Sequence, residues 1–264
     1  MLVLGLLLLL VFVGYYSATR DPVVVRYQVA FANWPAATRP LRVVQMSDIH
    51  VSWPDMPTTR LDRIVARVNA LEPDLIVLTG DYHGGKIWDR EIGDLDVTTR
   101  PLRNLHARLG VIAVRGNHDG PYWTPIVFGR LPITLLKNRW IDVGPIIVAG
   151  VDDLMGEFDP ARAVAGAPSG KPLIMLAHEP DFFNYMSPRV DLLIAGHTHG
   201  GQIRFPLVGA VPTGSPFLDA HLRGVFRKDR RRMIVSSGIG TSIIPLRIGV
   251  PPEVVEITLG PVTR

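Results

Sequence analysis

The sequence predicts an α/β fold in which two mixed sheets pack face to face between flanking helices, after one N-terminal hydrophobic helix. In the first half of the chain, hydrophobic runs of strand length alternate with amphipathic segments of helical period. In the second half, strand-like runs dominate. The chain has 264 residues, of which 47% are hydrophobic, and this is enough to bury the core of one α/β domain.

The first half of the chain predicts βαβ units and a mainly parallel sheet. Continuous apolar strands that alternate with helices are typical of a sheet that is buried on both faces. In the first predicted helix, Leu61, Ile64, Val65 and Val68 recur at spacings of three and four, which predicts one buried stripe. We expect strands at residues 41–46, 74–79 and 111–114, and helices at residues 58–70 and 97–109.

Residues 21–40, near the start of the chain, alternate in polarity and predict an edge strand that leads into the domain.

The second half of the chain is richer in strands. No internal repeat or second domain boundary is visible, so residues 21–264 are expected to form one domain. We expect strands at residues 146–150, 173–177, 192–195, 202–205, 233–236 and 253–259, and short helices at residues 160–165 and 180–186.

Residues 1–20 differ from the rest of the chain and predict a transmembrane anchor or an uncleaved signal helix. Residues 1–16 carry no charge, and a helix of this size is near the lower limit for crossing a bilayer. Tyr15 and Tyr16 lie where interfacial aromatic residues are common. The alternative is a cleaved signal peptide, but no Lys or Arg precedes the apolar run. Arg20 and Arg26 follow the helix, which favours the cytoplasmic side of the membrane for residues 21–264.

The charge balance is only mildly basic. The formal net charge is +4, and aromatic and basic residues are not interleaved, so nucleic acid is not expected as the primary partner. The chain has no cysteine, which excludes disulfides and thiolate metal sites. One basic cluster is either a charged hairpin tip or a contact for anionic lipid headgroups. It comprises Arg223, Arg227, Lys228, Arg230, Arg231 and Arg232.

Polar side chains of the types that bind metals follow five of the predicted strands. Ligands collect beyond the carboxyl ends of strands in α/β sheets, so these segments are expected to meet. Asp, Asn and His without Cys suit Mn, Fe or Zn. The five segments are Asp48-Ile49-His50, Gly80-Asp81, Gly116-Asn117-His118-Asp119, His178-Glu179 and Gly196-His197-Thr198-His199-Gly200-Gly201.

Spacing within the segments also favours a metal site. Asp48 and His50 stand two residues apart, as do His197 and His199, so each pair points to one side of an extended segment. Taken singly, each segment is common in surface loops. The five together, in this order and at strand ends, predict one constructed site.

These segments resemble the motifs of the calcineurin-like metallophosphoesterase superfamily over about residues 41–201. A narrower similarity, to a bacterial subgroup of membrane-associated or exported phosphodiesterases, extends to later segments. Some relatives in that subgroup hydrolyse the pyrophosphate bond of a UDP-diacylglucosamine lipid precursor. The later segments are Gln202, Ser237-Gly238-Ile239-Gly240-Thr241, Pro245-Leu246-Arg247 and Pro251-Pro252-Glu253.

The resemblance implies a four-layer αββα sandwich with a two-metal site. It implies that Asp81 bridges two divalent transition-metal ions, Mn, Fe or Zn, and that His118 is a catalytic residue that binds no metal. One ion would be bound by Asp48, His50 and His199, and the other by Asn117, His178 and His197.

The expected activity is two-metal-ion hydrolysis of phosphodiester or pyrophosphate bonds by a metal-activated hydroxide, on a phosphate-ester substrate that is lipid-linked. His83 is a candidate for the substrate pocket, and Asp119 is either a partner that orients His118 or a solvated turn residue. The alternative functions are a nuclease or cyclic-nucleotide phosphodiesterase and, in a different class, a non-catalytic metal-binding scaffold. Four aromatic residues form either a rim for an apolar substrate or ordinary packing: Trp53, Tyr122, Trp123 and Phe128.

Overall fold

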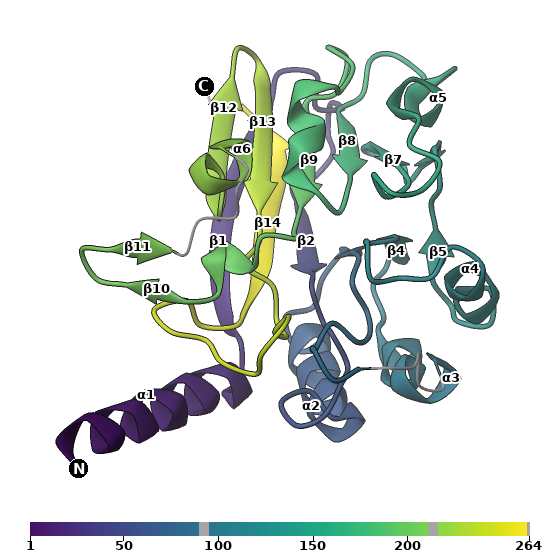
Figure 1. Ribbon diagram of the computed structural model, residues 1–264. Helices are drawn as coiled ribbons and strands as arrows, with labels where there is room; N and C mark the ends of the chain where they lie inside the picture. The colour runs from purple at the N-terminus through teal and green to yellow at the C-terminus, as the bar shows by residue number, and fades with distance from the viewer. Residues whose placement is uncertain (90–94, 211–215, 263–264) are drawn as a thin grey trace.

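The computed structural model describes residues 1–89, 95–210 and 216–262. Two sheets stand face to face in the middle of the molecule, with helices on their outer sides and one long helix projecting from one end (Figure 1). This arrangement confirms the predicted α/β fold, with two mixed sheets, flanking helices and a separate N-terminal helix.

The first sheet has the strand order β1-β14-β2-β3-β4-β5. Strands β2 to β5 are parallel, β14 is antiparallel to β2, and β1 lies at the edge as predicted, parallel to β14. The parallel arrangement brings the carboxyl ends of β2, β3 and β4 to one edge. The strands are β1 (Val23–Phe31), β14 (Glu253–Pro261), β2 (Leu41–Met46), β3 (Leu75–Thr79), β4 (Val111–Val114) and β5 (Thr134–Leu135).

The second sheet has the order β12-β13-β9-β8-β7-β6. Its four central strands are parallel, and both edge strands are antiparallel to their neighbours. A separate two-stranded hairpin pairs β10 (Arg204–Phe205) with β11 (Gly209–Ala210). The sheet strands are β12 (Gly224–Lys228), β13 (Arg231–Val235), β9 (Leu192–Ala195), β8 (Leu173–Leu176), β7 (Ile147–Gly150) and β6 (Arg139–Asp142).

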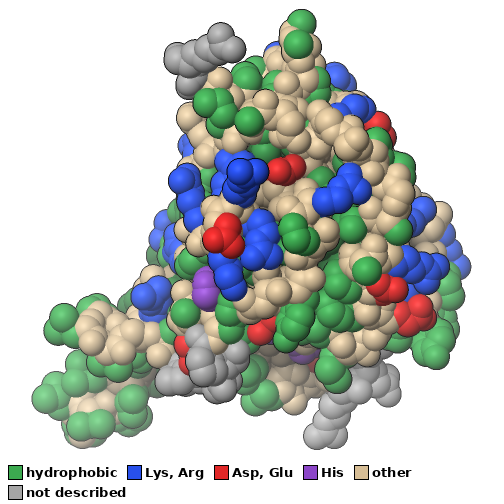
Figure 2. Space-filling model, turned by 90° about the horizontal axis from the view of Figure 1, so that it is seen from above, with side chains coloured by type: hydrophobic (Ala, Val, Ile, Leu, Met, Phe, Trp, Pro, Cys, Tyr) green, Lys and Arg blue, Asp and Glu red, His purple; other side chains and the backbone are tan. Residues whose placement is uncertain are grey.

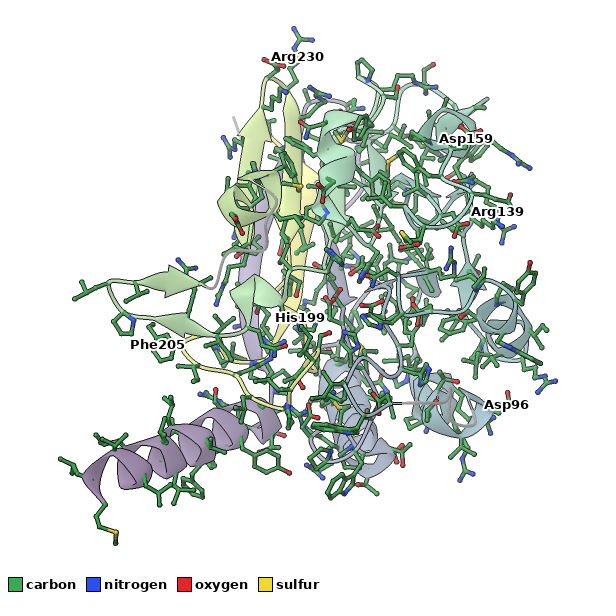
Figure 3. All side chains as sticks on the ribbon, in the orientation of Figure 1. Asp96, Arg139, Asp159, His199, Phe205 and Arg230 are labelled. Atoms are coloured by element: carbon green, nitrogen blue, oxygen red, sulfur yellow. The ribbon has the colours of Figure 1, made fainter. Side chains whose placement is uncertain are left out.

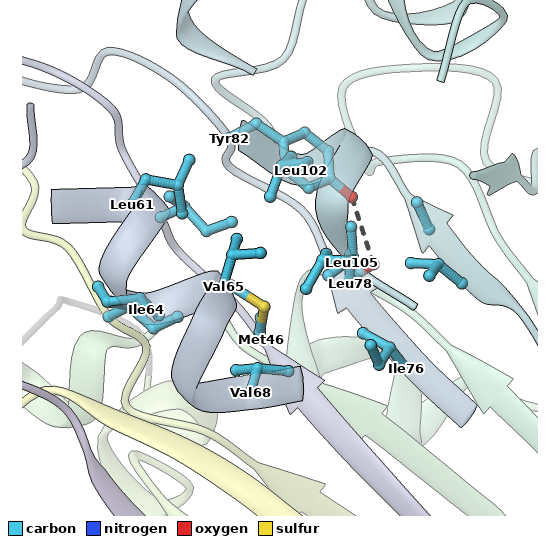
Figure 4. Close-up of a cluster of buried hydrophobic side chains, with 14 of the residues drawn as sticks. Met46, Leu61, Ile64, Val65, Val68, Ile76, Leu78, Tyr82, Leu102 and Leu105 are labelled. Carbon is cyan, nitrogen blue, oxygen red and sulfur yellow. Dashed lines mark hydrogen bonds between the residues drawn. The ribbon is translucent and has the colours of Figure 1, made fainter. Parts of the chain in front are cut away.

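Three hydrophobic clusters hold the layers together. The cluster between the sheets joins side chains such as Val43 and Val77 to Val148 and Ile174. Outside the first sheet, α2 buries Leu61, Ile64, Val65 and Val68, the predicted stripe, against Met46, Ile76 and Leu78 (Figure 4). Outside the second sheet, the third cluster includes residues of α5 and η2. The helices are α2 (Thr58–Asn69), α3 (Leu95–Thr98), η1 (Arg100–Asn104), α4 (Trp123–Phe128), α5 (Pro160–Val164), η2 (Pro180–Asn184), η3 (His199–Gly201) and α6 (Pro216–Ala220).

Two predicted elements differ from the structure. The helix expected at residues 97–109 is divided into α3 and the 3₁₀-helix η1, because Pro101 has no N–H to continue the first helix and instead occupies the first turn of the second. The strand expected at residues 202–205 is limited to Arg204–Phe205, because Gln202 has a φ of 43°, which no extended strand contains.

The N-terminal helix α1 (Leu2–Thr19) is long and apolar enough to cross a membrane, and most of it is exposed. A signal sequence would meet the same criteria of length and composition. Gly14 and Ala18, near the C-terminal end of α1, are buried against the rest of the chain. The last turns of α1 are therefore docked on the domain, while its earlier part projects from it (Figure 1).

Apart from Arg223, which directly precedes β12, the basic cluster lies on a charged hairpin, β12–β13, with Asp229 and Arg230 at its tip. The guanidinium groups of Arg231 and Arg232 lie over the rings of Phe183 and Phe31, at 5.7 and 4.8 Å from the ring centroids. Figure 3 places Arg230 at the end of the molecule opposite α1, and Figure 2, which views that end, shows Lys and Arg side chains gathered there. The cluster therefore does not support contact with a membrane that α1 would cross.

Candidate metal centre

The residues proposed as ligands follow the carboxyl ends of strands from both sheets. Asp48 and His50 follow β2, Asp81 follows β3, and Asn117 follows β4. From the second sheet, His178 follows β8, and His197 and His199 follow β9. The structure brings all seven predicted ligands together at one end of the two-sheet core, and Figure 3 marks this place at His199.

The backbone at the site is held in an unusual conformation. Asp48, His50, Asp81, His197 and His199 all have φ between 48° and 71°, the left-handed region that side chains rarely adopt. Backbone hydrogen bonds hold this conformation, for example from the N–H of His50 to the carbonyl of Asp81, at 3.0 Å. Such outliers cluster at functional sites, where the fold over-determines the position of a side chain.

Glycine is required where these loops approach each other. A Cβ atom on Gly196 would collide with the side chains of Ser47 and Asp48, and one on Gly116 would collide with Asp81. Close packing of the loops therefore depends on glycine at both positions.

A first group of donor atoms comes from Asp48, His50 and His199. The Nε2 atoms of His50 and His199 lie 3.1 Å apart, and Nε2 of His199 lies 3.5 Å from Oδ1 of Asp48. All three side chains are buried. These three residues form one candidate metal-binding group.

A second group comes from Asn117, His178 and His197. Oδ1 of Asn117 lies 3.0 Å from Nε2 of His178 and 3.0 Å from Nδ1 of His197. The two imidazole nitrogens are 3.2 Å apart. The three donor atoms therefore face one another around a single point.

Asp81 connects the two groups. Its Oδ2 atom lies 3.3 Å from Nε2 of His50, in the first group, and 3.2 Å from Nε2 of His178, in the second. The ligand atoms of Asp48, Asp81 and His178 also lie within 4.8 Å of one another, so the groups are adjacent. A carboxylate in this position can be shared by two ions.

The donor atoms fit divalent transition-metal ions. Ligand bonds of about 2.1 Å in tetrahedral or octahedral geometry separate neighbouring donors by about 3.0–3.4 Å, close to the spacings seen here. The second ring nitrogens of two histidines face backbone carbonyls, Nδ1 of His50 at 2.8 Å from Gly84 and Nδ1 of His178 at 2.7 Å from Thr79. These contacts orient each Nε2 toward the centre, as outer-shell partners of metal ligands do.

Electrostatics in the metal-free protein keep His50 and His197 neutral, whereas His178 holds a proton beside Asp81. Burial lowers the pKa of His50 to about 3 and that of His197 to about 4. Burial alone would raise the pKa of Asp81, but the charge of His178, its hydrogen bond to Asp81 and a further contribution from His50 together hold that pKa well below the usual range. Conversely, burial would lower the pKa of His178, but the Asp81 carboxylate raises it well above 6.5.

Metal affinity is expected to depend on pH. His178 must lose its proton to bind a metal, so the apparent affinity for Mn²⁺ or Zn²⁺ should fall by roughly tenfold for each pH unit below neutrality. The slope should steepen below pH 6, because burial raises the pKa of Asp48 to about 6 and a second proton then competes. Calorimetric titrations in two buffers of different protonation enthalpy would count the protons released. Affinity independent of pH, without proton release, would contradict this assignment.

His118 and Asp119 have different roles from each other. His118 is exposed, its ring centroid lies 5.1 Å from that of His50, and its N–H donates to Oδ1 of Asp81 at 2.9 Å. Asp119 is buried, and its carboxylate accepts hydrogen bonds from the N–H groups of Asp81, Tyr82 and Gly116 at 2.7–2.9 Å. These bonds hold the loop that carries Asp81, so both sequence interpretations of Asp119 were wrong: the residue is neither solvated nor placed to orient His118.

A pocket of about 440 Å³ opens at the centre. Its lining includes four predicted ligands, Asp81, Asn117, His197 and His199, together with the predicted catalytic residue His118. His83 is buried and is not among the lining residues, so the structure does not support its predicted contact with substrate. Of the four aromatic candidates, Phe128 lies in the core, and the other three are exposed.

Sequence reasoning missed several residues of the site. Gln202, Ser242 and Ile243 line the pocket. Gln45 is fully buried and donates to Thr79 Oγ1 at 2.9 Å and to the carbonyl of Ala195 at 2.8 Å, which joins the two sheets beneath the ligands. A lone glutamine in a strand carries no local signal for this role, whereas Gln202 directly follows the His197–Gly201 segment.

Comparisons with known proteins agree with this geometry. A family model described as "Calcineurin-like phosphoesterase" matches residues 41–201. A Danio rerio protein named "Transmembrane protein with metallophosphoesterase domain" is 32% identical over 271 residues, which are 93% of this chain but only 59% of that protein. A Bacillus subtilis protein named "Uncharacterized metallophosphoesterase YkuE" is 32% identical over 231 residues, 83% of this chain and 78% of the relative.

A solved structure shows the same fold. The NAD nucleotidase of Haemophilus influenzae superposes with a TM-score of 0.52 at 13% identity, over 76% of this chain and 46% of that one. The predicted resemblance is confirmed by the family match and by the relatives. With the family model covering more than half of its residues, the chain belongs to the calcineurin-like phosphoesterase family.

Proposed function

We propose that the protein is a metal-dependent hydrolase of phosphodiester or pyrophosphate bonds that is anchored to a membrane by α1 and acts on a lipid-linked substrate. The observation that carries the proposal is the position of Asp81 Oδ2, at 3.2–3.3 Å from one imidazole of each donor group. A carboxylate that is shared between two groups of donor atoms is what a pair of divalent ions requires.

In the proposed site, Asp48, His50 and His199 would hold one ion and Asn117, His178 and His197 the other, with Asp81 shared. Such ions supply Lewis acidity toward a phosphoryl group and acidify water, whichever of Mn, Fe or Zn is bound. His118 lines the pocket and would donate a proton to the leaving oxygen. Its backbone N–H holds the shared carboxylate at the same time.

The docking of α1 supports a membrane location. The carbonyl of Gly14 in α1 accepts a hydrogen bond from the N–H of Arg247, at 3.0 Å. The strap that contains Arg247, residues 242–248, also contributes Ser242 and Ile243 to the pocket. Relatives are named transmembrane proteins. Arg20 and Arg26 follow the helix, so we propose the cytoplasmic face for the catalytic domain.

A substrate screen tests this function. Full-length protein reconstituted with Mn²⁺ or Zn²⁺ in vesicles would be offered phosphomonoesters, soluble diesters, cyclic nucleotides, oligonucleotides and a pyrophosphate-linked glycolipid. We expect the highest kcat/KM on the bilayer-resident diester or pyrophosphate. Deletion of residues 1–20 should reduce activity on that substrate and spare soluble diesters.

Two outcomes would contradict the proposal. A clear preference for monoesters would overturn the bond type, and equal rates on soluble and bilayer substrates, unchanged by the deletion, would overturn the lipid link. Protein stripped of metal by a chelator and then reloaded is the matched control for metal dependence.

A further inference from the structure

We infer that the β10–β11 hairpin inserts into the interface of the bilayer that holds α1, as a second membrane contact that sets the pocket against the lipid surface. The inference rests on the proposed anchoring by α1. It concerns residues 204–210, none of which belongs to the metal centre.

The tip of this hairpin is apolar and fully exposed. The turn between the strands is Pro206-Leu207-Val208, and Leu207 and Val208 are 108% and 81% exposed. Leu207 has a φ of 67°, a conformation for which turns in water normally use Gly, Asn or Asp. An apolar side chain held outward in this way has no stabilising role in the isolated domain, but it would be stabilised in a membrane interface.

The hairpin β12–β13 provides an internal comparison. Its tip, Asp229-Arg230, is charged, and Asp229 has a φ of 57°, the same left-handed conformation as Leu207. The residue at the left-handed position is therefore aspartate at one tip and leucine at the other. Figure 3 shows Arg230 at the end of the molecule opposite α1, whereas Phe205 of the apolar hairpin lies on the side from which α1 projects.

The apolar hairpin is attached to the segment on which α1 is docked. The N–H of Arg204 donates to the carbonyl of Ile248 at 2.8 Å, and the N–H of Ile248 donates to the carbonyl of Gln202 at 3.0 Å. The side chains of Leu246 and Ile248 also lie against Gly14 of α1, where an added Cβ would meet them at 3.4 Å. One short segment therefore joins the hairpin to the helix, and both project from the same side of the molecule (Figure 1).

The residue types in the docked part of α1 indicate how deep the side of the molecule that carries α1 and the hairpin lies in a bilayer. Residues 14–19 carry no charge, Tyr15 and Tyr16 lie among them, and the first charged residue is Arg20. Tyrosine pairs before a positive charge mark the headgroup level. The surface that contacts Gly14 and Ala18 therefore lies at this level, together with the exposed Ile243 of the strap.

Placement of the hairpin at this level affects the pocket directly. Gln202, at the base of the hairpin, lines the pocket and is three residues from His199. Its side-chain amide donates to the carbonyls of Ser242 and Ile244, which fixes the base of the hairpin to the strap. With the hairpin inserted, a headgroup phosphate could reach the centre while its acyl chains stay in the bilayer.

Site-specific labelling tests the insertion, because the chain contains no cysteine of its own. Full-length Leu207→Cys protein, labelled with a polarity-sensitive fluorophore, would be placed in vesicles of phosphatidylethanolamine and phosphatidylglycerol. Arg230→Cys, at the charged tip, is the matched control. We expect a blue-shifted emission and strong quenching by spin-labelled lipids at position 207, and emission typical of water at position 230.

Flotation of the same vesicles separates failure of this inference from failure of the proposed function. Protein that floats with vesicles while both labels report water retains the anchor and overturns the hairpin contact. Protein that does not float overturns the anchor, and the hairpin inference with it. Nanodiscs that hold either one or two copies of the protein test whether the hairpin tip contacts a second chain instead of lipid. A blue shift that requires two copies would assign the tip to a contact between chains and overturn the lipid assignment.

An activity measurement adds an independent readout. The double variant Leu207→Asp, Val208→Asp should lose roughly tenfold or more of its rate on a bilayer substrate, because two apolar side chains leave the interface. Its rate on a soluble diester should not change. Val225→Asp, which alters an exposed valine of β12, is the control and should affect neither rate. Equal losses on both substrates, or no loss on either, would overturn the inference.

Discussion

Replacement of Asp81 with asparagine is expected to reduce the bound metal from two ions to at most one and to lower the hydrolysis rate by at least about 10³-fold. The asparagine side chain has the same size, but it lacks the charge that two cations share. Its amide nitrogen cannot bind a metal in place of the Oδ2 atom that faces both His50 and His178. Metal content by mass spectrometry and kcat on a soluble diester would measure both effects.

The metal-free Asp81→Asn protein offers a readout that does not require activity. The raised pKa of His178 depends on the Asp81 carboxylate, whereas burial acts in the opposite direction. We therefore expect this pKa to fall in the variant, as measured by NMR titration. Asp142→Asn, at a half-exposed position where the carboxylate pairs with Lys171, should leave both metals and the rate unchanged. Two retained metals with full activity in Asp81→Asn would refute the shared-ligand assignment.

Replacement of His118 with asparagine is expected to lower kcat by 10²- to 10⁴-fold, the typical cost of a lost acid–base group, while both metals stay bound. His118 lines the pocket without belonging to either donor group, so its side chain can be removed without removing a ligand. The hydrogen bond that it donates to Asp81 comes from the backbone and is retained in the variant.

The choice of leaving group makes this prediction specific to proton donation. An ester that releases p-nitrophenolate needs little protonation, so its hydrolysis should lose much less than that of an alkyl diester. His106→Asn, at an exposed position, is the control. A loss of metal, or an equal loss on both esters, would show that His118 has a structural role instead.

Several parts of the fold followed from local patterns. The stripe on α2 could be predicted because side chains at spacings of three and four meet on one helix face, and the structure buries all four of its residues. The division of the helix expected at residues 97–109 was missed, although Pro101 was a local signal for it. The residue types of the site could likewise be predicted, because metal preference is a property of the side chain.

Other features depend on contacts between distant residues. Gln45 has no distinctive neighbours in the sequence, yet it joins the two sheets, and the segment that contains Asp119 gives no sign that Asp119 holds the loop of Asp81. The left-handed backbone of Asp48 and His199 is likewise imposed by packing of one loop against another. His83 was expected in the pocket because it is near Asp81 in sequence, but its side chain is buried and is not among the residues that line the pocket.

The sequence by itself determined which donor groups this protein carries, their order along strand ends and the apolar character of residues 1–16, since each is a property of single residues or short periods. Only the tertiary structure decided which donors face one another, that Asp81 lies between them, and that the apolar hairpin shares a side with α1 while the basic one does not. The physical reason is that these relations are distances across two packed sheets, and no local periodicity encodes which loops meet at their common edge.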